Sequence, residues 1–140
     1  ILGAAAGAVA VVKYGLARGV VVASVLIVST NLFFVLIALS GAQLALLTLT
    51  ISFDNLALGF GSTVMIAYMS SLVNAKFTAT QYALFSSINT FFGKLLAGFS
   101  GDVQLAVGWM NFFFYAAATG IPAVILSLLV ARQLSKESRA

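Results

Sequence analysis

The sequence contains neither cysteine nor histidine, and these two absences narrow its chemistry. Without cysteine the chain forms no disulfide, binds no metal through thiolates and has no thiol nucleophile. Without histidine it lacks the commonest metal ligand and the commonest general base. A membrane enzyme would also need a partner for the one acid that lies inside an apolar run. We therefore predict no metal, no cofactor and no enzymatic activity.

Charged residues are also scarce. They make up 7% of the chain, against roughly 25% in an ordinary soluble domain, while hydrophobic residues make up 62%. Residues 19–53 and 103–131 carry no charge at all. A hydrocarbon core of about 30 Å needs about 20 apolar residues, and a charge at its centre costs at least about 2.5 kcal/mol. Because no long stretch offers a polar face, we predict an all-α, polytopic transmembrane helix bundle rather than a soluble fold.

We expect four complete membrane spans and one partial span. Residues 1–12 are apolar but too short to cross a bilayer, and no basic region precedes them as in a signal peptide. They resemble the end of a helix, so we expect residues 1–140 to be a fragment of a longer bundle. The expected spans cover about residues 1–12 (partial), 20–39, 43–72, 79–98 and 106–131, followed by a tail at 132–140.

Local signals indicate where some of these spans begin or bend. Thr78 and Gln81 have the spacing of a capping box, which predicts a helix N-terminus at Thr78. Asp102 is expected in the loop between the last two spans. Pro122 is expected to kink the last span near its middle, because proline removes a backbone donor.

The basic residues predict the orientation in the membrane. The net charge of +4 comes from residues scattered between apolar spans, so it forms no nucleic-acid patch. Alternating spans put six of the seven basic residues on one side, which the positive-inside rule assigns to the cytoplasm together with the tail. These six residues are Lys13, Arg18, Lys76, Arg132, Lys136 and Arg139.

Asp54 and Lys94 interrupt apolar spans, and an ionisable residue within a membrane is a candidate functional site. Counting from the expected outer ends, both lie roughly 12–20 Å deep at a helical rise of about 1.5 Å per residue. A pair between them would either gate a proton or substrate, or simply neutralise two charges and hold two helices in register. Alternatively, Lys94 extends its long side chain to the outer interface.

Small and polar residues predict how the helices pack. Gly93, Ala97 and Gly101 recur every four residues, as do Gly3 and Gly7, and such spacing lets helix backbones approach closely in lipid. Polar residues inside the spans either line a cavity or form interhelical hydrogen bonds. These polar residues are Asn31, Asn55, Gln81, Asn89 and Asn111.

Several stretches together resemble a known family. The most diagnostic is Phe-Thr-Ala-Thr-Gln-Tyr-Ala-Leu at residues 77–84. The others are the surrounding residues 68–87, Gly93-Lys94, Gly108-Trp109 and Gly120-Ile-Pro122. Over about residues 10–132 the chain resembles the AmpG-like muropeptide permeases of the major facilitator superfamily. The resemblance implies that the chain is the second half of a C-terminal six-helix bundle.

The resemblance also implies roles for particular residues. Lys13 and Arg18 lie in a degraded copy of the superfamily's cytoplasmic basic loop between helices eight and nine. Lys76, Thr78 and Gln81 belong to the loop and cap before helix eleven. An acidic residue followed by asparagine in helix ten matches Asp54-Asn55, whereas Lys94 stands where the family typically has arginine, which changes a bidentate donor into a point charge. The candidates for proton coupling or the substrate pathway are Asp54, Lys94, Asn55 and Asn89.

The function implied by the resemblance is proton-coupled import of anhydro-muropeptides across a bacterial inner membrane, by alternating access between two bundles. Its partners would be membrane lipid, the solute, protons and the missing N-terminal helices, with no nucleic acid. Two alternatives stay open: a carrier of another small solute, such as a sugar, a drug or acetyl-coenzyme A, and a non-transporting membrane scaffold or remnant.

Overall fold

The computed structural model describes residues 1–41, 43–73 and 78–137, and these residues form helices and no strand. The helices are α1 (Leu2–Tyr14), α2 (Leu16–Ser40), α3 (Leu44–Leu72), α4 (Thr78–Gly98) and α5 (Ser100–Glu137). The predicted all-α class is confirmed. Three of the helices, α2, α3 and α5, are long and apolar enough to cross a membrane, and α1 is a shorter apolar helix of 13 residues.

Helix α4 differs from the span expected at residues 79–98. It has 21 residues, but it does not reach the mean hydropathy of the three long apolar helices. The reason is its polar content, because five serine and threonine residues, together with Gln81, Asn89 and Lys94, interrupt its apolar residues before position 95. By hydropathy and length, three of the described helices qualify as complete candidate spans, and the span expected at residues 79–98 stays a prediction.

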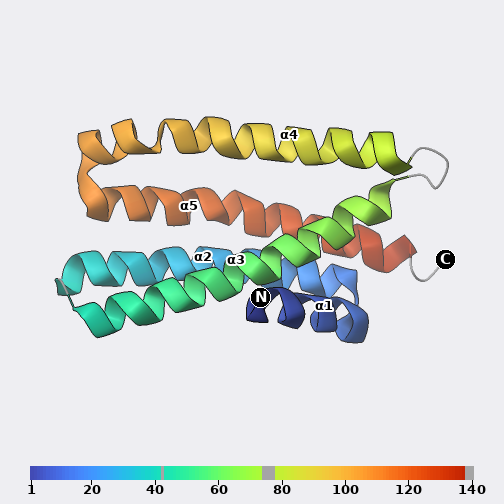
Figure 1. Ribbon diagram of the computed structural model, residues 1–140, viewed down its shortest axis with the longest axis horizontal. Helices are drawn as coiled ribbons and strands as arrows, with labels where there is room; N and C mark the ends of the chain where they lie inside the picture. Colours follow the sequence, from blue (N-terminus) through green and yellow to red (C-terminus); the bar gives the residue numbers. More distant parts are fainter. Residues whose placement is uncertain (42, 74–77, 138–140) are drawn as a thin grey trace.

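The last helix breaks at Gly108, where the backbone leaves helical angles at φ 78° and ψ 165°. A positive φ is strained for a residue with a Cβ atom, so glycine suits this position. In Figure 1 the chain reverses direction in this orange region, so that residues 100–107 continue the course of α4. One expectation is corrected, because Asp102 lies in the first turn of α5 rather than in a loop. Pro122 lies inside α5, and the bend expected there stays a prediction.

The helix ends gather at two ends of the bundle. Five helix ends lie together at one end of the bundle in Figure 1. They are the end of α1, the start of α2, the end of α3, the start of α4 and the end of α5. The turn at Gly41 and the reversal at Gly108 lie at the opposite end. Lys13, Arg18 and the last turns of α5 therefore share one end of the molecule. The predicted loop residue Lys76 and the tail residue Arg139 lie outside the described residues.

Helices α1 and α3 touch backbone to backbone. A Cβ atom on Gly3 would collide with the carbonyl oxygen of Leu56, and one on Gly7 would lie 2.8 Å from the carbonyl oxygen of Phe60. From the other side, a Cβ atom on Gly59 would lie 3.1 Å from the backbone nitrogen of Ala4. The close packing predicted from Gly3 and Gly7 is therefore present.

Helix α2 lies between α3 and α5 and contacts both. Towards α3, a small core forms around Ala23, Phe60 and Val64, which are at most 8% exposed. Towards α5, the hydroxyls of Ser24 and Ser127 lie 2.8 Å apart, and the rings of Phe34 and Phe113 stack with centroids 5.2 Å apart. The contacts of α2 thus hold α3 and α5 in one body.

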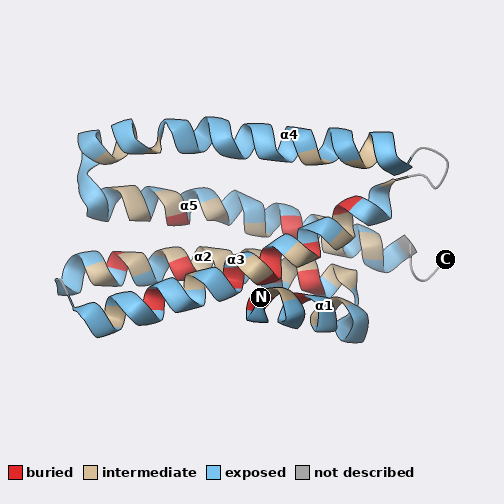
Figure 2. Ribbon diagram, viewed as in Figure 1, coloured by how far each residue is buried: buried red, intermediate tan, exposed pale blue. Residues whose placement is uncertain are grey.

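Helix α4 is the exception to this packing. None of its residues is buried, and Figure 2 shows it exposed along almost its whole length. The close packing predicted for Gly93, Ala97 and Gly101 is not formed, since a Cβ atom on Gly93 or Gly101 would meet nothing within 4 Å. The predicted small-residue spacing is thus used by α1, whereas Gly93 on α4 and Gly101 in the first turn of α5 have no neighbour among the described residues.

Candidate functional site

Asp54 lies at the interface between α2 and α3, where its carboxylate meets a hydroxyl. Its side chain is half-buried, and its Oδ1 lies 3.0 Å from Oγ1 of Thr30, which is 5% exposed. Both residues lie ten positions from the turn that joins the helices, Thr30 before Ser40 and Asp54 after Leu44. At about 1.5 Å per residue, the pair sits about 15 Å along each candidate span.

The Thr30 hydroxyl lies within hydrogen-bond distance of two acceptors. The Thr30 hydroxyl lies 2.9 Å from the carbonyl oxygen of Ile27 and 3.0 Å from the Asp54 carboxylate. A hydroxyl carries one hydrogen, so it fully donates to only one of these acceptors at a time. If Asp54 holds a proton, its own O–H donates to Thr30 while Thr30 donates to Ile27. The Ile27 carbonyl and the Asp54 carboxylate therefore compete for the one hydrogen of Thr30.

A second threonine lies one turn from Asp54 on the same helix. Thr50 is 1% exposed, and its Oγ1 has no hydrogen-bond partner among the described residues. Residues four apart share a face of a helix, so Thr50 and Asp54 lie on the same side of α3. Sequence reasoning missed both Thr30 and Thr50. Thr30 had a signal, since residues equally distant from a helical hairpin turn face one another.

The other candidate residues do not join Asp54. Lys94 is exposed on α4, and no ion pair forms between it and Asp54, although the structure describes both side chains. Asn55 is exposed and donates to the carbonyl oxygen of Ile51 on its own helix, at 2.8 Å. The structure therefore gives Asp54 a partner on α2 and does not bring the predicted Asp54–Lys94 pair together.

Asn89 instead faces a groove of about 700 Å³ bounded by α2, α3 and α5. The lining is mostly apolar, with Asn31 and Asn89 among the polar residues. Of the other predicted polar residues, Asn111 is exposed and donates to the carbonyl oxygen of Val107 at 3.0 Å. A mostly apolar groove with a few polar groups is typical of a site for an organic solute. The further polar side chains in the lining are Ser24, Ser62, Tyr68, Thr119 and Ser127.

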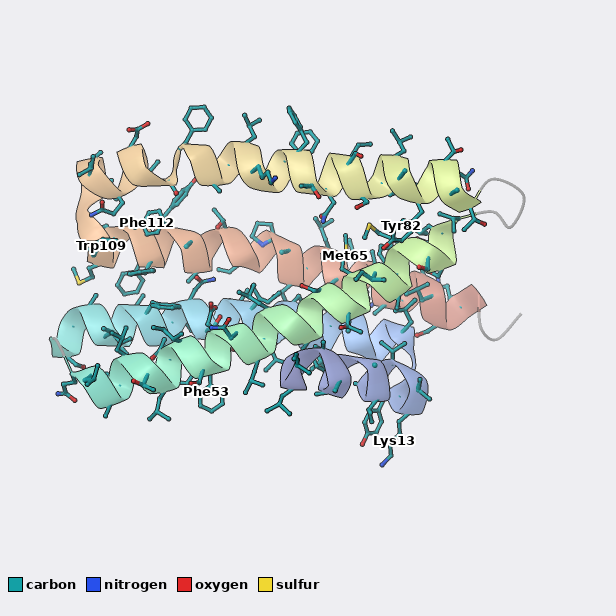
Figure 3. The ribbon with its side chains drawn as sticks, viewed as in Figure 1. Lys13, Phe53, Met65, Tyr82, Trp109 and Phe112 are labelled. Carbon is teal, nitrogen blue, oxygen red and sulfur yellow. The ribbon has the colours of Figure 1, made fainter. Side chains whose placement is uncertain are left out.

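Those predicted loop residues that the structure describes lie at the end of the bundle opposite Gly41 and Gly108. Lys13 is in the last turn of α1, and in Figure 3 its side chain points away from the bundle. Arg18 is in the first turn of α2, and Thr78 begins α4, where the capping box predicts a helix start. Gln81 follows three residues later and is half-buried. Within the described ranges, no three acidic residues gather where a metal ion would fit.

Comparison with known proteins finds bacterial permeases. The chain is 30% identical over 140 residues to the anhydromuropeptide permease of Escherichia coli strain K12, covering 99% of this chain and 28% of that protein. It is 31% identical over 106 residues to AmpG 1 of Rickettsia prowazekii, covering 76% of this chain and 24% of that transporter. It is 24% identical over 135 residues to AmpG 4 of Rickettsia felis, covering 96% of this chain and 33% of that transporter.

The chain spans about a quarter to a third of the length of these curated relatives. No family model matches it. No solved structure matches it either. The resemblance seen in the sequence is confirmed by the similarity to relatives named AmpG and anhydromuropeptide permease. With its long apolar helices, this chain is an AmpG-like membrane protein, homologous to a part of those transporters.

Proposed function

We propose that this chain is the C-terminal part of a proton-coupled importer of anhydro-muropeptides, which works by alternating access in a bacterial inner membrane with its C-terminal tail in the cytoplasm. The substrate is inferred from the Escherichia coli relative, whose name is anhydromuropeptide permease. The remaining helices of the carrier would come from outside residues 1–140, because the relatives are three to four times as long.

The observation that carries the coupling proposal is the contact between Asp54 and Thr30. A carboxyl group in the middle of an apolar span is costly, and such residues commonly serve proton relays. In the proposed cycle, a proton adds to Asp54 and forms an O–H bond, while the Thr30 hydrogen turns from Asp54 to the carbonyl oxygen of Ile27. Loss of the proton reverses both changes.

The proposed solute route is the groove of about 700 Å³ beside this pair. It is lined by α2 and α3, the same helices that hold Thr30 and Asp54. Movement of α3 against α2 during the proton cycle would therefore alter the groove wall. Asn31, which follows Thr30 directly, and Asn89 supply polar groups there. The alternative of a non-transporting scaffold predicts an Asp54 that faces lipid, whereas the half-buried, hydrogen-bonded Asp54 favours transport.

Uptake by membrane vesicles that contain the full-length protein tests this function. With a pH gradient, acid outside, the parent protein should accumulate labelled anhydro-muropeptide. Asp54→Asn keeps the shape of the side chain and removes the titrating group, so it should abolish accumulation while exchange of labelled for unlabelled solute continues. Asp102→Asn is the matched control, because Asp102 is an exposed acid outside the helix interface.

Two results would contradict the proposal at different levels. Accumulation by Asp54→Asn at the parent level would remove Asp54 from the coupling mechanism. Absence of anhydro-muropeptide exchange by the parent protein, with exchange of a sugar or a drug in its place, would leave a carrier but reject the substrate.

A further inference from the structure

A basic groove lies between α2 and α5 at the end of the bundle where α2 begins. Three cationic side chains line it: Arg18 from the first turn of α2, and Arg132 and Lys136 from the last turns of α5. The groove has a volume of about 580 Å³. More than a hundred residues separate Arg18 from Arg132 in the sequence, so the fold brings these charges together. The general excess of basic residues on one side of a membrane does not require these three side chains to share one groove.

Of the acids whose side chains the structure describes, Asp54 and Asp102, neither lies beside these charges. Asp54 lies about 15 Å along α3 from the opposite end, and Asp102 lies near the reversal at Gly108, so neither lines the groove. The first turn of α2 adds to the positive potential, because its N-terminus has no side-chain cap and leaves backbone N–H groups open. The groove is therefore suited to an anion.

The deeper wall of the same groove is apolar. Val21 and Val22 follow Arg18 by about one turn, and Leu128 and Ala131 precede Arg132 on α5. Val22 and Leu128 are 46% and 45% exposed, so their side chains are open to whatever surrounds the bundle. The cations lie at the end of the helices, and the open apolar side chains lie one turn deeper. A phospholipid has the same order, with a charged headgroup above its acyl chains.

The length of α2 puts the cations at headgroup depth. Its 25 residues are about 37 Å long, which exceeds a hydrocarbon core of about 30 Å, so its first turn reaches the polar layer. Basic pockets between transmembrane helices at this level bind the phosphates of anionic lipids. We propose that Arg18, Arg132 and Lys136 form a site for an anionic phospholipid, with its phosphate on the cations and its acyl chains along Val22 and Leu128. This site does not depend on the transported solute.

Native mass spectrometry of the full-length protein in detergent tests the site. Cardiolipin and dioleoylphosphatidylglycerol should remain bound, and dioleoylphosphatidylcholine, which has no net charge, should not. Each cation near a membrane surface contributes about a fivefold gain in affinity for anionic lipid. Arg18→Gln and Arg132→Gln should therefore each weaken binding about fivefold, and Gln at all three positions should weaken it roughly a hundredfold.

Matched variants separate this site from general charge. Lys13→Gln removes a cation at the same end that does not line the groove, and it should leave lipid binding at the parent level. Replacing Arg18 and Arg132 by lysine keeps the charge and should retain binding within a few-fold. If the triple variant does not fold, the single variants still decide the question.

Three results would overturn the proposal. Lipid binding that is unchanged in Arg18→Gln and Arg132→Gln would remove these residues from the site. An equal loss in Lys13→Gln would reduce the effect to general surface charge. Displacement of cardiolipin by millimolar inorganic phosphate would identify the groove as a site for a free anion, because a soluble ion does not use the apolar wall.

Discussion

The interface between α1 and α3 and the surface of α4 contain the same kind of residue pattern with opposite outcomes. In the first, Gly3 and Gly7 are buried against the backbone of α3. In the second, Gly93 has no described neighbour within 4 Å at the position of a Cβ atom, and the same holds for Gly101 in the first turn of α5, which continues the pattern. Small residues four positions apart therefore permit close helix contact but do not produce it; a partner backbone must also be present.

The comparison extends to the charged candidates. Asp54 lies in the packed region, where a hydroxyl from a second helix reaches it, whereas Lys94 lies on exposed α4 without an ion-pair partner among the described residues. A buried charge is stable only when other groups satisfy it, and an exposed cation has no such requirement. The packed region thus contains the candidate site, and α4 contributes Asn89 to the adjoining groove.

The largest contrast should come from filling the two glycine positions. Gly7→Leu places new atoms against the carbonyl oxygen of Phe60, only 2.8 Å from an added Cβ, and should lower the free energy of unfolding by about 3 kcal/mol. Gly93→Leu should change it by less than about 0.5 kcal/mol through contacts within this chain. Thermal unfolding of both variants in detergent, followed by circular dichroism, measures the difference. Equal losses would show that α4 is as closely packed as α1.

A core deletion should give a smaller effect in the same direction. Val64 is 1% exposed between α2 and α3, so Val64→Ala leaves a cavity and should cost about 2 kcal/mol. Leu96 on α4 is 71% exposed, and Leu96→Ala should be close to neutral by the same unfolding measurement. A large loss at Leu96 would mean that the rest of the full-length protein covers this part of α4.

The smallest effect should come from the polar contact between α2 and α5. Ser24 and Ser127 lie 2.8 Å apart, and an interhelical hydrogen bond in a membrane contributes about 0.6 kcal/mol on average. Ser24→Ala should therefore lower the free energy of unfolding by about that amount. Ser62→Ala is the control, because within the described part of the chain Ser62 donates only to the carbonyl oxygen of Leu58 on its own helix. The hydrogen-bond interpretation fails if both substitutions have the same effect.

The sequence predicts α2, α3 and α5 well because long uncharged stretches have few alternatives to crossing a membrane. It predicts the break in α5 poorly. Asp102 and Pro122 are the residues that usually mark loops and kinks, yet the chain reverses at Gly108, a residue that apolar helices also tolerate. Backbone dihedral angles at a single glycine depend on how the flanking helices pack, and composition does not report that.

The candidate site is half predicted for a related reason. A charge inside an apolar run singles out Asp54 from sequence alone, but the charge pattern predicts Lys94 as its partner, whereas the structure gives it Thr30. Thr30 is uncharged and resembles any other polar residue in a span. Only the symmetric distance of Thr30 and Asp54 from the turn between α2 and α3 pointed to their contact. The sequence also does not predict that α4 stays exposed, because hydropathy does not determine which helices pack against one another.

A double-mutant cycle tests most directly the central claim that the partner of Asp54 is Thr30 on α2 and not Lys94 on α4. Unfolding free energies would be measured for Thr30→Val, Asp54→Asn and Lys94→Leu, and for the two double variants that contain Asp54→Asn. Thr30 and Asp54 should couple by about 0.6–1.7 kcal/mol, the range for interhelical hydrogen bonds in membranes. Lys94 and Asp54 should be additive within about 0.5 kcal/mol. Coupling of Asp54 to Lys94 with none to Thr30 would contradict the account.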